Sequence, residues 1–167
     1  EIIASIETRK ERKSWWQVYG LGQLGEVEGK IYTDWQIVDA IPHEARLERI
    51  GLDFGYTNDP SAIVAVYYYN GGYIVDELAY GTELTNEYTA GKILEVGNAL
   101  TIADCAEPKT IEEIYKAGIN IKPSDKDVWA GIVGVKSYPL FVKGENLINE
   151  LQSYKWKKDK NDNVTED

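Results

Sequence analysis

Two aspartates interrupt apolar runs in the middle of the chain. Asp53 follows the residues IGL, and Asp104 follows the residues LTIA. A lone ionised carboxylate in a buried strand is costly unless it is paired or bound to a metal. Two carboxylates that meet repel each other, and a divalent cation relieves that repulsion. Mg²⁺ and Mn²⁺ prefer oxygen ligands and often bind through one or two carboxylates plus substrate phosphates. The pair is therefore a candidate metal site.

Purely structural roles for the two aspartates stay open at this stage. Asp53 could end a strand and bind backbone amides in the turn that follows it. Asp104 could cap the loop that precedes Pro108. Spacing alone does not decide between these roles and metal binding.

The elements around the aspartates predict a mixed sheet with helices packed on it. From Ile50 the sequence indicates a meander of three antiparallel strands, with the hairpin turn Asn70-Gly71-Gly72 between the second and third. A fourth short strand ends at Asp104. If the first and fourth strands are neighbours, Asp53 and Asp104 face each other at one edge of the sheet.

Four helical patterns alternate with short strands in the second half of the chain. The first covers 85–97 with Thr85 as its cap, and the second begins with Thr110 as its cap and ends at Gly118. A third helix is predicted over 126–136. The fourth, GENLINELQSYKW, is amphipathic, with Leu147, Ile148, Leu151 and Tyr154 predicted to face inward.

Composition narrows the class of function. The chain has 167 residues and a formal net charge of −10, which argues against a generic basic nucleic-acid module. It does not exclude an enzyme whose clustered carboxylates hold cations, since the metal supplies positive charge locally. One cysteine excludes an internal disulfide framework, and one histidine excludes a multi-histidine zinc site. No apolar run is long enough to span a membrane, and no P-loop motif occurs.

Three segments, in order, resemble the nuclease domain of the large terminase subunit of tailed bacteriophages. They are GLDFGYTNDPSAIVAV, IADCAEPKTIEEI and NLINELQSYKWKKD. The resemblance implies an α/β fold of the ribonuclease H-like type, a mixed β-sheet flanked by helices with an N-terminal linker arm. It further implies three regions: an arm over 1–49 that follows an ATPase domain, a nuclease domain over 50–158, and a polar tail over 159–167.

The family cuts concatemeric viral DNA during genome packaging, using two divalent metal ions. The resemblance therefore implies Mg²⁺ or Mn²⁺ as cofactor, Asp53 as the metal ligand of the first strand, and Asp104 as the second catalytic acid. It also implies double-stranded DNA as substrate, and the portal protein and the small terminase subunit as partners. The expected location is the host cytoplasm, for a viral protein that is not a virion component.

A third acid of the family lies in a later motif, roughly His-x-x-Asp-Ala-x-Arg-Tyr. No such motif occurs through Asp167, and Asp159, Asp162 and Asp167 in the tail do not match it. We therefore expect residues 1–167 to be weakly active or inactive, and the longer parent to be a nuclease.

Five other residues are candidates for outer-shell or substrate contacts. Glu107 could reach the same site or bridge to Lys109, and it could equally be a solvent-facing turn residue. Glu77, on the third strand, is either an outer-shell acid or an exposed edge residue. Lys122, Lys126 and Lys136 are candidates for phosphate contacts, with a solvated surface as the alternative.

Two other classes of function compete with the nuclease. A non-catalytic docking module for DNA or the portal would bind no divalent metal. An actin-like nucleotide binder is suggested by GLDFGYT, which resembles the first phosphate loop of that superfamily. That fold needs two lobes and a second phosphate loop, and the sequence contains neither.

Overall fold

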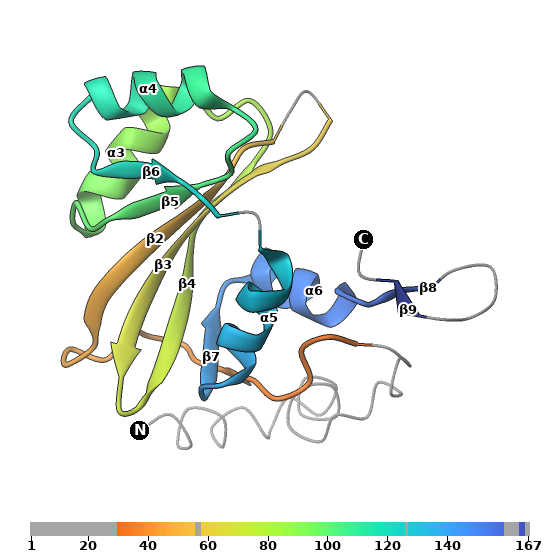
Figure 1. The fold of residues 1–167 in the computed structure, drawn as a ribbon. Helices are drawn as coiled ribbons and strands as arrows, with labels where there is room; N and C mark the ends of the chain where they lie inside the picture. Colours follow the sequence, from red (N-terminus) through yellow and green to blue (C-terminus); the bar gives the residue numbers. More distant parts are fainter. Residues whose placement is uncertain (1–29, 56–57, 126, 159–163, 166–167) are drawn as a thin grey trace.

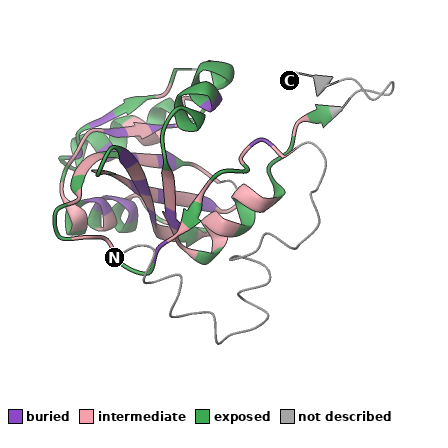
Figure 2. Ribbon diagram, turned by 90° about the horizontal axis from the view of Figure 1, so that it is seen from below, coloured by how far each residue is buried: buried purple, intermediate pink, exposed green. Residues whose placement is uncertain are grey.

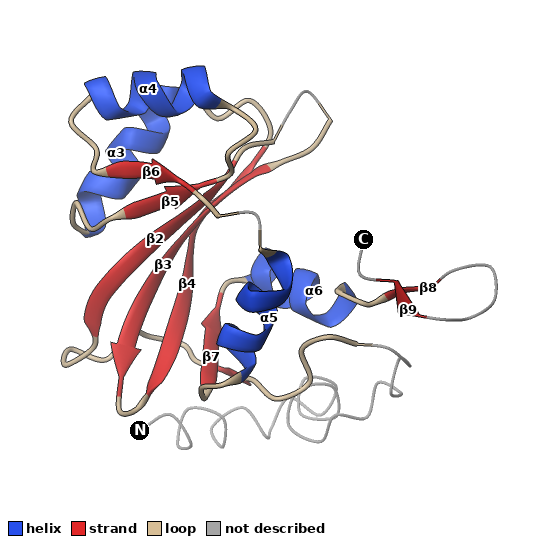
Figure 3. Cartoon of the chain, in the orientation of Figure 1, coloured by secondary structure: helices blue, strands red, loops and turns tan. Residues whose placement is uncertain are grey.

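The computed structural model describes residues 30–55, 58–125, 127–158 and 164–165 (Figure 1). The strands are β1 (Gln36–Ile37), β2 (Arg46–Asp53), β3 (Ser61–Tyr69), β4 (Gly72–Gly81), β5 (Thr101–Ala103), β6 (Ile121–Pro123), β7 (Leu140–Lys143), β8 (Lys157–Lys158) and β9 (Val164–Thr165). The helices are α3 (Asn86–Val96), α4 (Pro108–Lys116), α5 (Val128–Lys136) and α6 (Glu145–Ser153). Helices α3 and α4 lie near β5 and β6, and helices α5 and α6 lie near β7 (Figure 3).

The main sheet has the strand order β1-β7-β4-β3-β2-β5-β6. Strands β2, β3 and β4 form an antiparallel meander. Strands β5 and β6 extend it in parallel beside β2, and β7 and β1 extend it in parallel beside β4. The predicted mixed sheet is confirmed, and the first and fourth core strands, β2 and β5, are neighbours, which is the condition under which Asp53 and Asp104 are expected to meet.

The hairpin between β3 and β4 forms where the sequence predicts it. Asn70 and Gly71 both have positive φ, 50° and 80°. Asparagine and glycine are the residues that most readily adopt this left-handed conformation, and a tight two-residue hairpin requires it at both positions. The turn therefore sets the register that pairs Tyr69 with Gly72.

The two faces of the meander have different surroundings, because successive side chains of a strand point to opposite faces. The core face carries Ile50, Leu52 and Ile63, which pack with Ile93 of α3 and Ile114 of α4. The opposite face, called the site face below, carries the alternate residues of each strand. Buried residues concentrate on the strands and on the helix surfaces turned toward them (Figure 2).

The helix starts show one confirmed prediction and one error. The Thr85 side chain caps α3 by accepting from the backbone N–H of Tyr88, as predicted. Helix α4 begins at Pro108, with Glu107 as its N-cap, and not after Thr110. Proline is favoured at the first helical position, because its missing N–H has no partner there and its φ already suits a helix.

The fourth helix is shorter than predicted. Helix α6 ends at Ser153, and Tyr154 is an extended cap residue that is 44% exposed, so its predicted inward position is wrong. Leu147, Ile148 and Leu151 are partly buried, in keeping with the predicted apolar side.

The sheet begins before the predicted boundary at residue 50. Strand β2 starts at Arg46, and β1, within the predicted arm, pairs with β7. The segment RLER lacks the apolar pattern of a strand because three of its four residues are charged, and in the sheet its side chains are exposed or partly buried. Residues 1–29 of the arm lie outside the described residues. In the predicted polar tail, Val164–Thr165 forms β9 and pairs with β8.

Candidate metal centre

Asp53 and Asp104 lie side by side at the ends of two parallel strands. The β2–β5 register pairs Ile50 with Thr101 and Leu52 with Ala103. The backbone N–H of Asp104 donates to the carbonyl oxygen of Leu52, at an N–O distance of 3.0 Å. The next residues in this register are Asp53 and Asp104, both on the site face. The predicted meeting of these two residues is confirmed in the backbone.

The electrostatics around Asp53 are those of crowded carboxylates. Burial raises the pKa of the Asp53 carboxyl, and the negative charges of Asp104 and Glu150 raise it further. Asp53 nevertheless keeps an exposed surface. A carboxylate that is crowded by like charge and open to solvent is suited to receive a cation.

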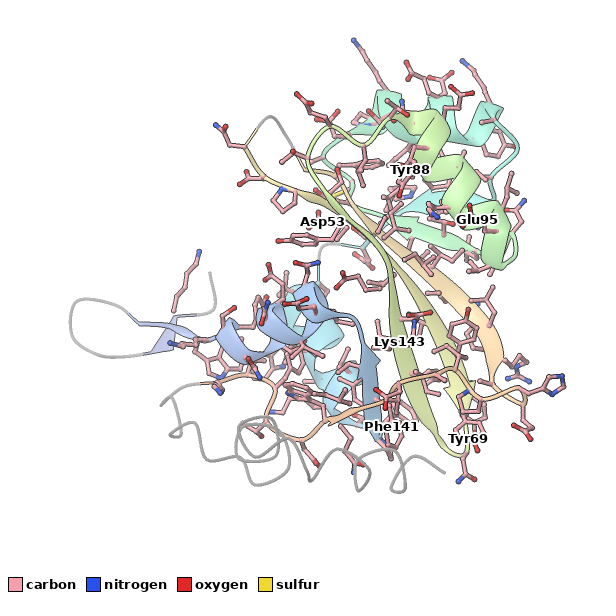
Figure 4. The ribbon with its side chains drawn as sticks, turned by 180° about the vertical axis from the view of Figure 1, so that it is seen from behind. Asp53, Tyr69, Tyr88, Glu95, Phe141 and Lys143 are labelled. Atoms are coloured by element: carbon pink, nitrogen blue, oxygen red, sulfur yellow. The ribbon has the colours of Figure 1, made fainter. Side chains whose placement is uncertain are left out.

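The turn after Asp53 is tightly packed, which holds the carboxylate at the end of the strand. The Gly55 N–H donates to Ser61 Oγ at 2.9 Å. A Cβ at position 55 would collide with the backbone of Asp59 and Pro60, so glycine is required there. Asp53 and the Tyr69 hairpin lie at opposite ends of the meander (Figure 4).

Glu150 is a third acid near Asp53 that the sequence analysis did not single out. It lies on α6 and is one of the charges that raise the pKa of Asp53. The Tyr80 hydroxyl donates to Glu150 Oε1 at 3.4 Å. Tyr80 pairs with Ala62, and Ala62 pairs with Asp53, so all three residues lie on the site face in one row. The sequence marks Glu150 only as a polar position of an amphipathic helix.

Glu77 fixes the start of α6. The Leu147 N–H donates to Glu77 Oε2 at 2.6 Å, and Asn146 Nδ2 donates to Glu77 Oε1 at 2.8 Å. Gly144, with φ of 133°, packs so closely on Glu77 that a Cβ there would overlap the Glu77 side chain. Glu77 thus positions the helix that carries Glu150, and both of its oxygens are engaged in doing so.

The remaining predicted contact residues are spread over the fold. Glu107 occupies the N-cap position of α4, and its carboxylate accepts a hydrogen bond from the Thr110 hydroxyl at 3.4 Å. Lys122 is exposed on β6, two strands from Asp53. Lys136 ends α5 and lines a cavity of about 370 Å³ with residues of β1 and β7, at the opposite edge of the sheet from β5. Lys126 lies outside the described residues.

That cavity does not coincide with the aspartates. Its lining comes from 34–36 and 136–141, and neither Asp53 nor Asp104 belongs to it. The two aspartates therefore lie outside this cavity.

The two aspartates fit a divalent cation that keeps open positions for water and phosphate. Both offer oxygen atoms, and their mutual repulsion is relieved by positive charge. Within the part of the chain that the structure describes, no group of three or more His, Cys, Asp or Glu residues could hold a metal ion. A metal here would have Asp53 and Asp104 as its described protein ligands.

No protein-family model matches the chain, and no curated protein matches it in sequence. None of the described helices has the length and apolar character needed to cross a membrane.

Solved structures of terminases share this fold. The nuclease domain of the large terminase of bacteriophage SPP1, solved with bound Mn, superimposes with a TM-score of 0.66 and 23% identity, over 80% of this chain and 86% of that one. The large terminase of a thermophilic bacteriophage gives 0.63 and 20% identity, over 77% of this chain and 37% of that one. The same thermophilic-phage protein in complex with ADP gives 0.63 and 19% identity, over 89% and 44%.

The chain thus spans less than half of the thermophilic-phage protein, but most of the SPP1 nuclease domain. Its mixed sheet and flanking helices have the ribonuclease H-like fold of the large terminase nuclease domain.

Proposed function

We propose that this chain is the metal-dependent endonuclease domain of a large terminase subunit, which cleaves concatemeric viral DNA during genome packaging in the host cytoplasm. The observation that carries the proposal is the juxtaposition of Asp53 and Asp104 at the ends of β2 and β5, on a terminase nuclease fold. The SPP1 domain with bound Mn supports a divalent cofactor for this fold.

Asp53 and Asp104 are the residues that would hold Mg²⁺ or Mn²⁺. When bound, such ions activate a water for attack on the phosphodiester and stabilise the leaving oxygen. The protein's own contribution is positioning. The β2–β5 register holds the two carboxylates together, and the Gly55 turn fixes Asp53. Glu77 holds the start of α6, the helix that carries Glu150, and Tyr80 of β4 donates to Glu150 beside the aspartates.

A full two-metal site needs more protein ligands than the described residues provide. The sequence also lacks a later motif of the form His-x-x-Asp-Ala-x-Arg-Tyr, so we propose that residues 1–167 bind metal weakly and cleave poorly. Double-stranded DNA is the proposed substrate, and the portal protein and the small terminase subunit are the proposed partners of the longer protein.

Calorimetric titration with Mn²⁺ tests the metal centre. The unsubstituted chain should release or absorb heat, and Asp53→Asn and Asp104→Asn should each abolish the signal. Glu95→Gln on α3 is the matched control, since it also removes one carboxylate but lies on a helix that packs on the core face. Binding that survives both aspartate substitutions, or no binding by the unsubstituted chain, would overturn the assignment.

Conversion of supercoiled plasmid in Mn²⁺ tests the reaction. Residues 1–167 should act slowly, and Asp53→Asn should act no faster than the buffer. A chain extended to include a motif of the form His-x-x-Asp-Ala-x-Arg-Tyr should act much faster. Equal rates for the short and extended chains would show that residues 1–167 already complete the site.

A further inference from the structure

Two exposed cations share the site face with the aspartates. Arg49 on β2 and Lys122 on β6 are both exposed, whereas their chain neighbours Ile50 and Ile121 are 0% and 6% exposed. Because strand side chains alternate between faces, burial of the isoleucines on the core face turns Arg49 and Lys122 to the other side. That side also carries Asp53, which is four residues from Arg49 and therefore of the same parity.

The strand register gives the spacing of these charges. Lys122 pairs with Ile102, and Ile102 pairs with Gly51, so Lys122 lies in the site-face row next to that of the aspartates. Neighbouring strands are about 4.8 Å apart, which places Lys122 roughly 10 Å across the sheet from β2. At about 3.3 Å per residue, Arg49 lies roughly 13 Å along β2 from Asp53.

Both cations are available to a ligand. Neither forms an ion pair with a carboxylate of the described residues. Arg49 donates one hydrogen bond, to the backbone oxygen of Glu48 at 2.7 Å. Arg46, by contrast, is paired with Glu48 and lies over the Tyr68 ring. The chain has a net charge of −10, yet these two cations have no carboxylate partner among the described residues. Their position beside an acidic site makes this face complementary to a polyanion.

We propose that Arg49 and Lys122 bind backbone phosphates of the DNA duplex next to the point of cleavage. The inference rests on the proposed function and extends it, because it assigns the path that the substrate takes over the sheet. Each strand of a duplex presents one phosphate per about 3.4 Å of axis, so the distance from Arg49 to Asp53 spans roughly four phosphates. These contacts read no base and add affinity of a salt-dependent kind.

The test is DNA binding, measured apart from cleavage. Fluorescence anisotropy of a short labelled duplex in EDTA, at several salt concentrations, compares the unsubstituted chain with Arg49→Gln and Lys122→Gln. Each substitution should reduce the slope of log affinity against log salt by about 1. Raising the salt from about 50 to 200 mM should therefore weaken the affinity roughly fourfold less for each substituted chain than for the unsubstituted chain.

Lys116→Gln is the matched control. It removes the same charge from an exposed side chain at the end of α4, a helix that packs on the core face, and its partner is the exposed Glu112. Its slope should equal that of the unsubstituted chain. Circular dichroism verifies that all three variants are folded.

The outcomes separate this inference from the proposed function. If Arg49→Gln and Lys122→Gln bind with the slope of Lys116→Gln, or if the unsubstituted chain does not bind DNA, the phosphate path is wrong. Mn²⁺ binding and plasmid conversion by Asp53 and Asp104 could still hold in that case. If the slopes fall as expected while Asp53→Asn leaves cleavage unchanged, the surface binds DNA and the nuclease proposal fails instead.

Discussion

Removal of the Glu77 carboxylate should loosen α6 from the sheet. Glu77 accepts two hydrogen bonds at the helix start, from Leu147 N–H at 2.6 Å and from Asn146 Nδ2 at 2.8 Å. The Leu147 N–H is one of the first amides of the helix, which have no partner within the helix itself. In Glu77→Ala this amide and the Asn146 side chain lose their acceptor.

The cost follows from the number and kind of these bonds. A hydrogen bond to a charged group contributes about 1.5–3 kcal/mol, and a negative charge at a helix start adds about 0.3–1 kcal/mol. Glu77 is half-buried, so water replaces part of what is lost. We expect Glu77→Ala to lower the free energy of unfolding by about 2–3 kcal/mol. For a chain of this size, that corresponds to a fall in Tm of roughly 4–12 °C.

Urea unfolding measures the global effect, and hydrogen exchange measures the local one. Exchange of the Leu147 amide should speed up strongly in Glu77→Ala, more than exchange of the core strands. Asn146→Ala is the comparison, since it removes the weaker bond and leaves the Leu147 cap in place, at a cost of about 1 kcal/mol. Glu77→Gln should fall between the two, because one neutral oxygen can still accept from Leu147.

Two results would refute this account of α6. One is a loss of unfolding free energy below about 0.5 kcal/mol in Glu77→Ala, the low end for a single hydrogen bond. The other is unchanged hydrogen exchange at the Leu147 amide. Either result would mean that apolar contacts alone hold the helix on β4 and β7, and that Glu77 is an ordinary surface acid.

Two further predictions concern glycines and pH. Gly144→Ala should destabilise the folded chain by about 2–3 kcal/mol, because φ is 133° and a Cβ there overlaps Glu77. Gly131→Ala in α5 should instead stabilise the folded chain by about 0.5–1 kcal/mol, because a Cβ there meets nothing within 4 Å and alanine favours a helix. Thermal unfolding measures both changes. Asp53→Asn should stabilise the metal-free chain at neutral pH, since the raised pKa of Asp53 means that its ionised form weakens the native state. Solvent screening limits that gain to about 0.5 kcal/mol. The gain should vanish as pH falls below the ordinary carboxyl pKa of 3.8, where the carboxyl is protonated in both folded and unfolded chains; a gain that persists in acid would contradict this assignment.

Several features of the molecule could be predicted from the sequence because their signals are local. The Asn70-Gly71 turn needs residues that tolerate positive φ, and the Thr85 cap needs a side chain that reaches an amide three residues on. Asp53 and Asp104 stood out because a carboxylate after an apolar run is costly without a partner. The same cost suggested that the two carboxylates meet, on the condition that their strands are neighbours, and the pairing of β2 with β5 fulfils that condition.

Other features depend on register between distant segments, which a single sequence does not encode locally. Ile63 pairs with Ala79 and Val64 with Glu77, so a bulge at Leu78 shifts the alternation along β4. This shift lets both Glu77 and Tyr80 face α6. The pairing of β1 with β7 and the start of β2 at Arg46 were missed for a similar reason, because short or half-polar strands gain their partners only in the folded sheet.

The sequence by itself determined that two carboxylates interrupt apolar strands, and that their chemistry suits a divalent cation. Only the tertiary structure decided which groups surround them. Glu150 approaches Asp53 because Glu77, 70 residues before Leu147 in the chain, holds the start of α6. Arg49 and Lys122 share a face with the aspartates because the parallel register of β2, β5 and β6 aligns them. The physical reason is that the cost of a buried charge is visible in its own strand, whereas the neighbours of that charge are set by long-range strand and helix packing.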